Sequence, residues 1–168
     1  HGYGRPYNYI ELPDEDGLFE LRDVPHGTLP QEFYKSKISD NWEKLILYLP
    51  PCVPSAGLPV LYLQHGFGES EISWSTTGKV NILMDNLIAA GKIKPFAIVM
   101  GNGMVKQRID GKLKLNRALY GQMLVEEILP MLEKKYQFGG SKEKRGMAGL
   151  SMGSVQTTRI ICEHPELF

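Results

Sequence analysis

A serine set between two glycines is the feature of this sequence with the clearest chemical potential. Residues 149–153 (GLSMG) match G-x-S-x-G and fall between a predicted strand and a predicted helix. A turn this sharp leaves no room for side chains at residues 149 and 153, so both must be glycine. It would hold the Ser151 hydroxyl at the helix start, where free N–H groups and the helix dipole favour developing negative charge. Ser151 is therefore the candidate nucleophile, and a serine that merely caps the helix is the alternative.

A second motif could assist the same reaction by donating hydrogen bonds. Residues 65–68 (HGFG) directly follow the apolar run of residues 58–64. Acyl transfer passes through a tetrahedral oxyanion, which needs two preorganised N–H donors. One donor is expected from Met152, the residue after the serine, and the other from Phe67, whose flanking glycines let the backbone turn inward. A plain turn at the end of a strand is the alternative for this motif.

A general base for Ser151 is not evident among the histidines. His164 lies 13 residues beyond the serine on one predicted helix, which is about 20 Å at a rise of 1.5 Å per residue. Hydrogen-bond reach is only about 3 Å. His65 is expected to support its loop through hydrogen bonds rather than to act as the base. Without a base, a serine hydroxyl is a poor nucleophile at neutral pH.

The elements that must position these residues can be read from hydrophobic periodicity. Nearly continuous apolar runs suit strands that are buried on both faces, and apolar residues at helical spacing suit helices between them. This pattern predicts an α/β fold with a mostly parallel sheet, flanking helices and antiparallel leading strands. Asn116 is expected to cap the long helix and Pro130 to kink or restart it. Strands are predicted at 33–38, 44–49, 58–64, 95–100 and 144–150, and helices at 80–90, 117–136 and 152–164.

Composition limits the remaining possibilities. The 168 residues suffice for one domain, and 19 basic residues cancel 19 acidic ones, so no global charge favours nucleic acid or an anionic membrane. No apolar stretch approaches the roughly 20 residues that cross a bilayer. Metal-ligand spacing is absent, so neither a metal nor an organic cofactor is expected. A bridge between Cys52 and Cys162 is not favoured, and the densest basic run, residues 142–145, is expected to be a solvated turn.

Several stretches together resemble a known family. They are residues 25–27 (PHG), 44–51 (KLILYLPP), 58–74 (LPVLYLQHGFGESEISW), 82–95 (ILMDNLIAAGKIKP), 126–136 (EEILPMLEKKY) and 145–153 (RGMAGLSMG). The chain resembles the esterase D-like α/β-hydrolases, especially the feruloyl and acetylxylan esterases of carbohydrate esterase family 1. Members of that group continue well beyond the elbow helix, with a catalytic acid and then a histidine. The expectation is an extended arm or linker over residues 1–25 and an N-terminal, incomplete α/β-hydrolase domain over residues 26–168.

The resemblance also implies roles for individual residues. It implies Ser151 as the nucleophile and Phe67 and Met152 as the oxyanion donors. It places Trp74 near the acyl pocket, although a half-buried packing role is an equal alternative. His26 belongs to the Pro-His-Gly start of the domain and not to its catalytic centre. Ser154 departs from the family, which usually carries glycine there.

The function implied is that of a serine esterase that removes acyl groups from plant polysaccharide through an acyl-enzyme on Ser151. Alone, the chain is expected to be weakly active or inactive, because the acid and base of the triad are not found in it. The substrate points to an extracellular or periplasmic location, and an exposed sheet edge is expected to favour self-association. A non-catalytic module for carbohydrate binding or assembly is the main alternative. A thioester hydrolase or an acyltransferase on the same fold is another.

Overall fold

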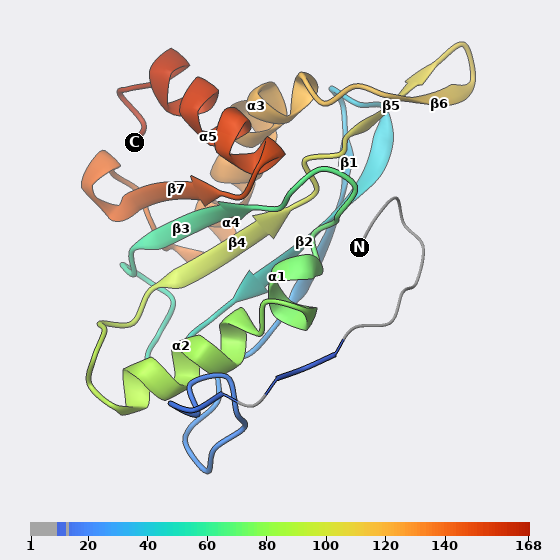
Figure 1. Ribbon diagram of the computed structural model, residues 1–168. Coiled ribbons are helices and arrows are strands. Elements are labelled where there is room, and N and C mark those ends of the chain that lie inside the picture. The colour runs from blue at the N-terminus through green and yellow to red at the C-terminus, as the bar shows by residue number, and fades with distance from the viewer. Residues whose placement is uncertain (1–9, 13) are drawn as a thin grey trace.

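The chain folds around a five-stranded mixed sheet with helices on both faces (Figure 1). The computed structural model describes residues 10–12 and 14–168, so residues 1–9 and 13 of the predicted arm lie outside it. The strand order is β1-β2-β4-β3-β7, with β1, β2 and β4 antiparallel in turn and β4, β3 and β7 parallel. The predicted α/β fold with antiparallel leading strands is thereby confirmed. The strands are β1 (Gln31–Ser36), β2 (Asn41–Tyr48), β3 (Val60–Gln64), β4 (Ala97–Gly101) and β7 (Arg145–Gly149).

Two apolar cores, one on each face of the sheet, explain why the central strands read as continuous apolar runs. Along β2, Leu45 and Leu47 point into one core, whereas Ile46 and Tyr48 point into the other. The first core is covered by α3, α4 and α5, and the second by α2 (Figure 1). The helices are α1 (Ser73–Thr76), α2 (Val80–Ala89), α3 (Leu119–Met123), a π-helical turn (Leu124–Ile128), α4 (Leu129–Tyr136), a 3₁₀ turn (Lys142–Lys144) and α5 (Met152–Glu163).

The first two strands begin earlier than predicted. Strand β1 starts at Gln31, which pairs with Ile46, and it ends at Ser36, which pairs with Asn41. Polar residues can take part in this edge pairing because backbone groups form the ladder, so hydrophobic periodicity alone misplaces the boundaries. The prediction also extended β1 to Ile38, where the structure instead has the turn into β2.

The long helix predicted over residues 117–136 is divided. The helix cap predicted at Asn116 is wrong, because α3 begins after Ala118 and the Asn116 side chain donates to Gln107 Oε1 at 3.0 Å. The interruption predicted at Pro130 is confirmed. This proline lies in the first turn of α4, directly after the π-helical turn. It has no N–H to donate to the carbonyl of Glu126 one turn earlier, so the regular ladder cannot continue through it.

A β-hairpin that the sequence analysis missed projects from the body between β4 and α3 (Figure 1). It consists of β5 (Lys106–Ile109) and β6 (Lys112–Leu115). Asp110 and Gly111 join the strands with φ of 51° and 75°. Positive φ at both central residues matches the right-handed twist of the flanking strands, and Asp-Gly is a favoured pair for such a turn.

Asp85 and Asn86, two polar residues of α2, hold residues 18–27 against that helix. Asp85 is buried and accepts hydrogen bonds from the Tyr48 hydroxyl at 2.6 Å and from the backbone N–H of Gly27 at 3.0 Å; His26 Nδ1 lies 3.0 Å from it. Asn86 donates to two backbone carbonyls within residues 18–20 at 2.8 and 2.9 Å. His26 is therefore part of the attachment of this segment to α2.

Two further findings concern the cysteines and membranes. Cys52 and Cys162 are both exposed and free, so no bridge joins them. Within residues 10–12 and 14–168, none of the helices is both long and apolar enough to cross a bilayer.

An ion pair fixes β7, the strand that leads into the serine, against α4. Arg145 donates to Glu133 through Nε at 2.6 Å and through Nη2 at 2.8 Å, with side chains only 10% and 12% exposed. The hydrogen bonds to Glu133 raise the pKa of the Arg145 guanidinium despite its burial. The solvated turn predicted for residues 142–145 is therefore wrong at its last residue.

Replacing Glu133 with alanine is expected to lower the free energy of unfolding by about 3–5 kcal/mol, because Arg145 would remain as a largely buried charge without its partner. Urea unfolding measures this change. Glu163→Ala is the matched control, since its pair with Arg159 is exposed and lies on one helix; that change should cost less than about 1 kcal/mol. Equal losses in the two variants would show that the pair with Arg145 does not stabilise β7.

Candidate active site

The turn between β7 and α5 has the geometry that the glycine-serine-glycine motif predicts. Ser151 has φ 52° and ψ −112°, a conformation that side chains rarely adopt, and its side chain is exposed. A Cβ placed on Gly149 would lie 2.4 Å from the carbonyl carbon of Gly153. A Cβ placed on Gly153 would lie 2.7 Å from the carbonyl oxygen of Gln64. Because these atoms belong to the backbone, only glycine fits at both positions.

The first turn of α5 presents an amide beside the serine. The N–H of Gly153 donates to Leu150, and the N–H groups of Ser154 and Val155 donate to the carbonyl of Ser151. Met152 is the first residue of α5, and its N–H has no backbone acceptor within the described part of the chain. Orphan N–H groups at a helix start carry the positive end of the helix dipole. The turn therefore offers a donor next to the exposed hydroxyl.

The HGFG loop is held in place through His65, which is buried. His65 Nδ1 lies 2.8 Å from the carbonyl of Gly66, and its Nε2 accepts from the N–H of Gly103 at 3.0 Å. This pattern requires a neutral ring with its proton on Nδ1. The predicted supporting role of His65 is confirmed, since Nδ1 bonds within its own loop and Nε2 joins that loop to the turn after β4.

Two further side chains brace this loop and were not identified from the sequence. The N–H of Gly66 donates to Glu69 Oε2 at 2.7 Å, so a carboxylate within the same segment stabilises the bend. Gln156, on α5, donates to the carbonyl of Gly103 at 3.1 Å and links the same turn to the helix of the serine. Neither residue lies in a recognisable motif, and the contact of Gln156 joins residues that are far apart in the sequence.

Gln64, at the end of β3, joins the loop to the serine turn. Its carbonyl accepts from the N–H of Leu150 at 3.1 Å and from Trp74 Nε1 at 3.0 Å. Its side chain donates to the hydroxyl of Tyr120 at 2.5 Å. Burial raises the pKa of Tyr120, so this hydroxyl stays protonated at neutral pH. A polar residue ending an apolar strand is the only signal of this role that the sequence carries.

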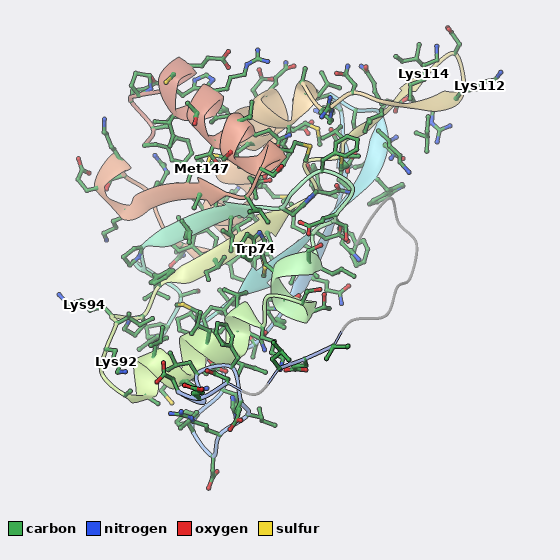
Figure 2. The ribbon with its side chains drawn as sticks, viewed as in Figure 1. Trp74, Lys92, Lys94, Lys112, Lys114 and Met147 are labelled. Carbon is green, nitrogen blue, oxygen red and sulfur yellow. The ribbon has the colours of Figure 1, made fainter. Side chains whose placement is uncertain are left out.

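Trp74 lies partly buried against the core beneath α2, at the position labelled in Figure 2. Its indole N–H is committed to Gln64, and its ring packs among apolar side chains. The structure thus shows the packing role that was one of the two alternatives for this residue. Phe67 is 42% exposed, and the guanidinium of Arg117 lies 5.0 Å from the centre of its ring.

The described histidines are all engaged away from Ser151. His26 is paired with Asp85 beside α2, His65 is committed to its loop, and His164 follows the far end of α5 with Nδ1 3.4 Å from Glu166. No group of three or more histidine, cysteine or acidic side chains in residues 10–12 and 14–168 could hold a metal ion.

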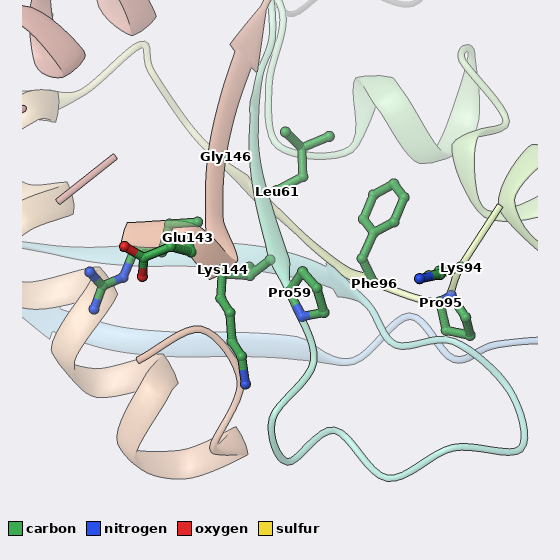
Figure 3. A pocket seen from close by; sticks show the side chains of 10 residues that line it. Pro59, Leu61, Lys94, Pro95, Phe96, Glu143, Lys144 and Gly146 are labelled. Carbon is green, nitrogen blue, oxygen red and sulfur yellow. The ribbon is translucent and has the colours of Figure 1, made fainter. Parts of the chain in front are cut away.

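A cavity of about 320 Å³ lies at the opposite end of the sheet from the serine (Figure 3). Pro59, Phe96 and Gly146 line it, next to the amino ends of β3, β4 and β7. Ser151 and the HGFG loop follow the carboxyl ends of the same parallel strands. The cavity is therefore separate from the candidate active site.

Comparison with known proteins agrees with this geometry. The sequence pattern of the family described as "Putative esterase" matches residues 36–168. The chain is 38% identical to an endo-1,4-beta-xylanase/feruloyl esterase of Xylanibacter ruminicola over 95% of its own length, but it spans only 23% of that protein.

Solved structures show the same fold. A ferulic acid esterase is 28% identical, with a TM-score of 0.74 over 86% of this chain and 58% of that one. The ferulic acid esterase of Anaeromyces mucronatus, solved in complex with ferulic acid, has a TM-score of 0.80 at 20% identity. That match covers 95% of this chain and 63% of the other, and it establishes the fold. Because the family pattern covers most of the chain and includes the serine turn, the chain belongs to this esterase family.

Proposed function

We propose that this chain carries the nucleophile and oxyanion donors of a serine carboxylic-ester hydrolase. The observation that supports this most directly is the backbone of Ser151, which is strained and exposed at the start of α5 between two glycines that no other residue can replace. Strained backbone persists where the surrounding structure enforces it, and it clusters at functional sites. A merely structural turn would not need the hydroxyl at that position.

The proposed reaction proceeds through an acyl-enzyme. The Ser151 oxygen attacks the ester carbonyl, and the resulting oxyanion is bound by the N–H groups of Met152 and Phe67. Collapse of the tetrahedral intermediate releases the alcohol of the sugar, and water then attacks the acyl-enzyme to release the acid. The general base is a histidine outside the described residues, because those described are engaged elsewhere.

The proposed substrate is an acylated plant polysaccharide, with feruloyl or acetyl groups on xylan. Support comes from the relative named as a xylanase and feruloyl esterase and from solved ferulic acid esterases of the same fold. Because such a polymer is too large to enter a cell, the proposed location is extracellular or periplasmic. The Trp74 indole N–H donates to the carbonyl of Gln64, the residue before the HGFG loop, and its proposed contribution to the acyl site is to hold the start of that loop.

A fluorophosphonate probe tests the proposal, since oxyanion donors beside a serine speed its phosphonylation relative to that of other serines. We expect an adduct at Ser151, identified by peptide mapping, after incubation of the 168-residue chain. The reaction should be slow, because oxyanion donors without a base retain only about 10³–10⁴-fold catalysis over water. Absence of any adduct, or an adduct at another serine, would contradict the proposal.

A non-catalytic module for carbohydrate binding or assembly is the second candidate. The engagement of all three described histidines away from the serine favours it. The same probe separates the two functions, because a binding module has no reason to activate Ser151.

We also propose that the chain associates with itself through β7. This strand pairs with β3 on one side and is at the edge of the sheet formed by the described residues. Backbone groups along such an edge can pair with another chain, and Met147 (labelled in Figure 2) and Ala148 on this strand are only partly covered.

Gly146→Lys is expected to convert an associating chain to a monomer, as measured by size-exclusion chromatography with light scattering. A Cβ at this position would meet only Leu61 Cδ1, at 3.6 Å, so the substitution adds charge to the edge without a clash. Ala90→Lys, at the exposed end of α2, is the control and should not change the mass. A wild-type chain that is monomeric at all concentrations would refute the association.

A further inference from the structure

The β5–β6 hairpin concentrates positive charge beside the candidate active site. Residues 106–117 contain five basic side chains and one acidic side chain, although the chain as a whole has no net charge. The hairpin begins shortly after β4 ends and extends beyond the body, with Lys112 and Lys114 on its outer strand (Figure 2). Uncharged residues separate the basic ones in this segment, so the sequence shows no dense basic run.

Most of these cations have no carboxylate partner. Among the ion pairs of the described residues, none includes Lys106, Lys112, Lys114 or Arg117. Arg108 donates to the carbonyl of Gly111 at 3.1 Å, within the hairpin. The charges of Lys106, Lys112 and Lys114 are therefore available to an anionic ligand.

The base of the hairpin is fixed to the body, so the cations have a defined position. The N–H of Arg108 donates to the carbonyl of Ser39 at 3.0 Å, and the N–H of Asn116 donates to Val105 at 2.8 Å. Arg117, directly after the hairpin, lies over the ring of Phe67 in the HGFG loop. Arg117 thus connects the end of the hairpin to the loop beside Ser151.

The hairpin places aliphatic side chains next to the cations. In the strand register Lys106 and Arg108 share one face of the hairpin with Leu115 and Leu113. Lys112 and Lys114 lie on the other face, opposite Ile109 and Gln107. Leu113 and Leu115 are 47% and 48% exposed. A uronic acid offers a matching surface, because its ring has an aliphatic face and its carboxylate is charged. Single-stranded nucleic acid would instead call for aromatic side chains on which bases stack, and residues 106–117 contain none.

We propose that the β5–β6 hairpin binds the glucuronic acid groups of an acidic xylan and so holds the polymer across the candidate active site. This inference rests on the proposed function, since it takes the ester that Ser151 attacks to be on that polymer. The hairpin would favour esters on acidic stretches of the polymer over esters on neutral ones.

Affinity electrophoresis tests the proposal with glucuronic-acid-bearing xylan and with the same xylan after reduction of its carboxyl groups. Exposed charge pairs each change affinity roughly 1.4- to 5-fold, so several together should give about 10-fold tighter binding to the acidic polymer. The preference should fall as salt is raised, because exposed charges are screened over about 8 Å at physiological ionic strength. Replacing Lys106, Arg108, Lys112 and Lys114 with glutamine should abolish the preference.

The matched control is the double variant Lys92→Gln and Lys94→Gln, which removes exposed cations at the other end of the molecule (Figure 2). It should keep the full preference for acidic xylan. Equal binding to both polymers, or a preference that survives in the hairpin variant, would overturn the proposal. Tighter binding to an oligonucleotide or to polygalacturonate than to acidic xylan would also overturn it. Affinity electrophoresis needs no ester hydrolysis, so its result is independent of labelling. The preference for acidic xylan can be absent while Ser151 is labelled, or present while Ser151 is not labelled.

Discussion

Replacing Ser151 with glycine is expected to abolish fluorophosphonate labelling while raising the free energy of unfolding by about 1 kcal/mol. A residue with a side chain at φ 52° and ψ −112° stores strain of roughly 1–3 kcal/mol, which glycine releases. Part of that gain is lost because glycine makes the unfolded chain more flexible, at a cost of about 0.4–1 kcal/mol. Because labelling is lost while stability rises, the experiment distinguishes the strain that the turn stores from the reactivity of the Ser151 hydroxyl.

Ser151→Ala is the matched variant for this experiment. It removes the same hydroxyl but keeps the Cβ, so labelling should be lost while the unfolding free energy changes by no more than about 0.5 kcal/mol. Urea unfolding and probe labelling of both variants complete the comparison. If glycine gives no more stability than alanine, the backbone at this position is not strained. If either variant is still labelled, the reactive group is not Ser151.

Much of the fold could be predicted because the central strands are apolar on both faces. Continuous apolar runs mark β3 and β4, and the interruption of the long helix follows from Pro130. Hydrophobic periodicity detects elements that face a core. It fails at β5 and β6, where nearly every residue is exposed and no core imposes a pattern. The Asp-Gly pair at residues 110–111 was the one local signal for that hairpin.

The candidate site likewise contains residues that the sequence predicted and residues that it did not. Ser151 was predictable because its turn depends on local backbone sterics, which two glycines reveal directly. The residues that support the site were not, because Gln64 and Gln156 bond to residues distant in the sequence, and the local bond from Gly66 to Glu69 belongs to no motif. The charge of Arg145 looked like part of a solvated run because its partner, Glu133, lies on a different element.

The hairpin and the serine turn also differ in how they would tolerate change. The hairpin contributes few core contacts, so its cations can be replaced without unfolding the chain. The serine turn is packed backbone against backbone, so a single methyl group there disturbs both the fold and the site. Substitutions of the hairpin cations can therefore change binding without changing the fold, whereas a Cβ added at Gly149 or Gly153 changes the fold and the site together.

Gly153→Ala is expected to lower the free energy of unfolding by about 2 kcal/mol and to remove labelling at Ser151. Its Cβ would lie 2.7 Å from the carbonyl oxygen of Gln64, a backbone atom that cannot move without shifting the end of β3. Overpacking of this kind costs roughly 1–3 kcal/mol and occasionally more, and the better helix propensity of alanine, about 1 kcal/mol, recovers only part.

Gly149→Ala should behave similarly, because its Cβ would lie 2.4 Å from the backbone of Gly153. Gly146→Ala is the control on the same strand, since its Cβ would have an ordinary contact of 3.6 Å with Leu61 Cδ1. Urea unfolding should show the first two variants strongly destabilised and the third within about 1 kcal/mol of wild type. Equal stability of all three would mean that β7 and α5 are not in close contact, and the placement of the Ser151 hydroxyl beside the Met152 amide would then lose its basis.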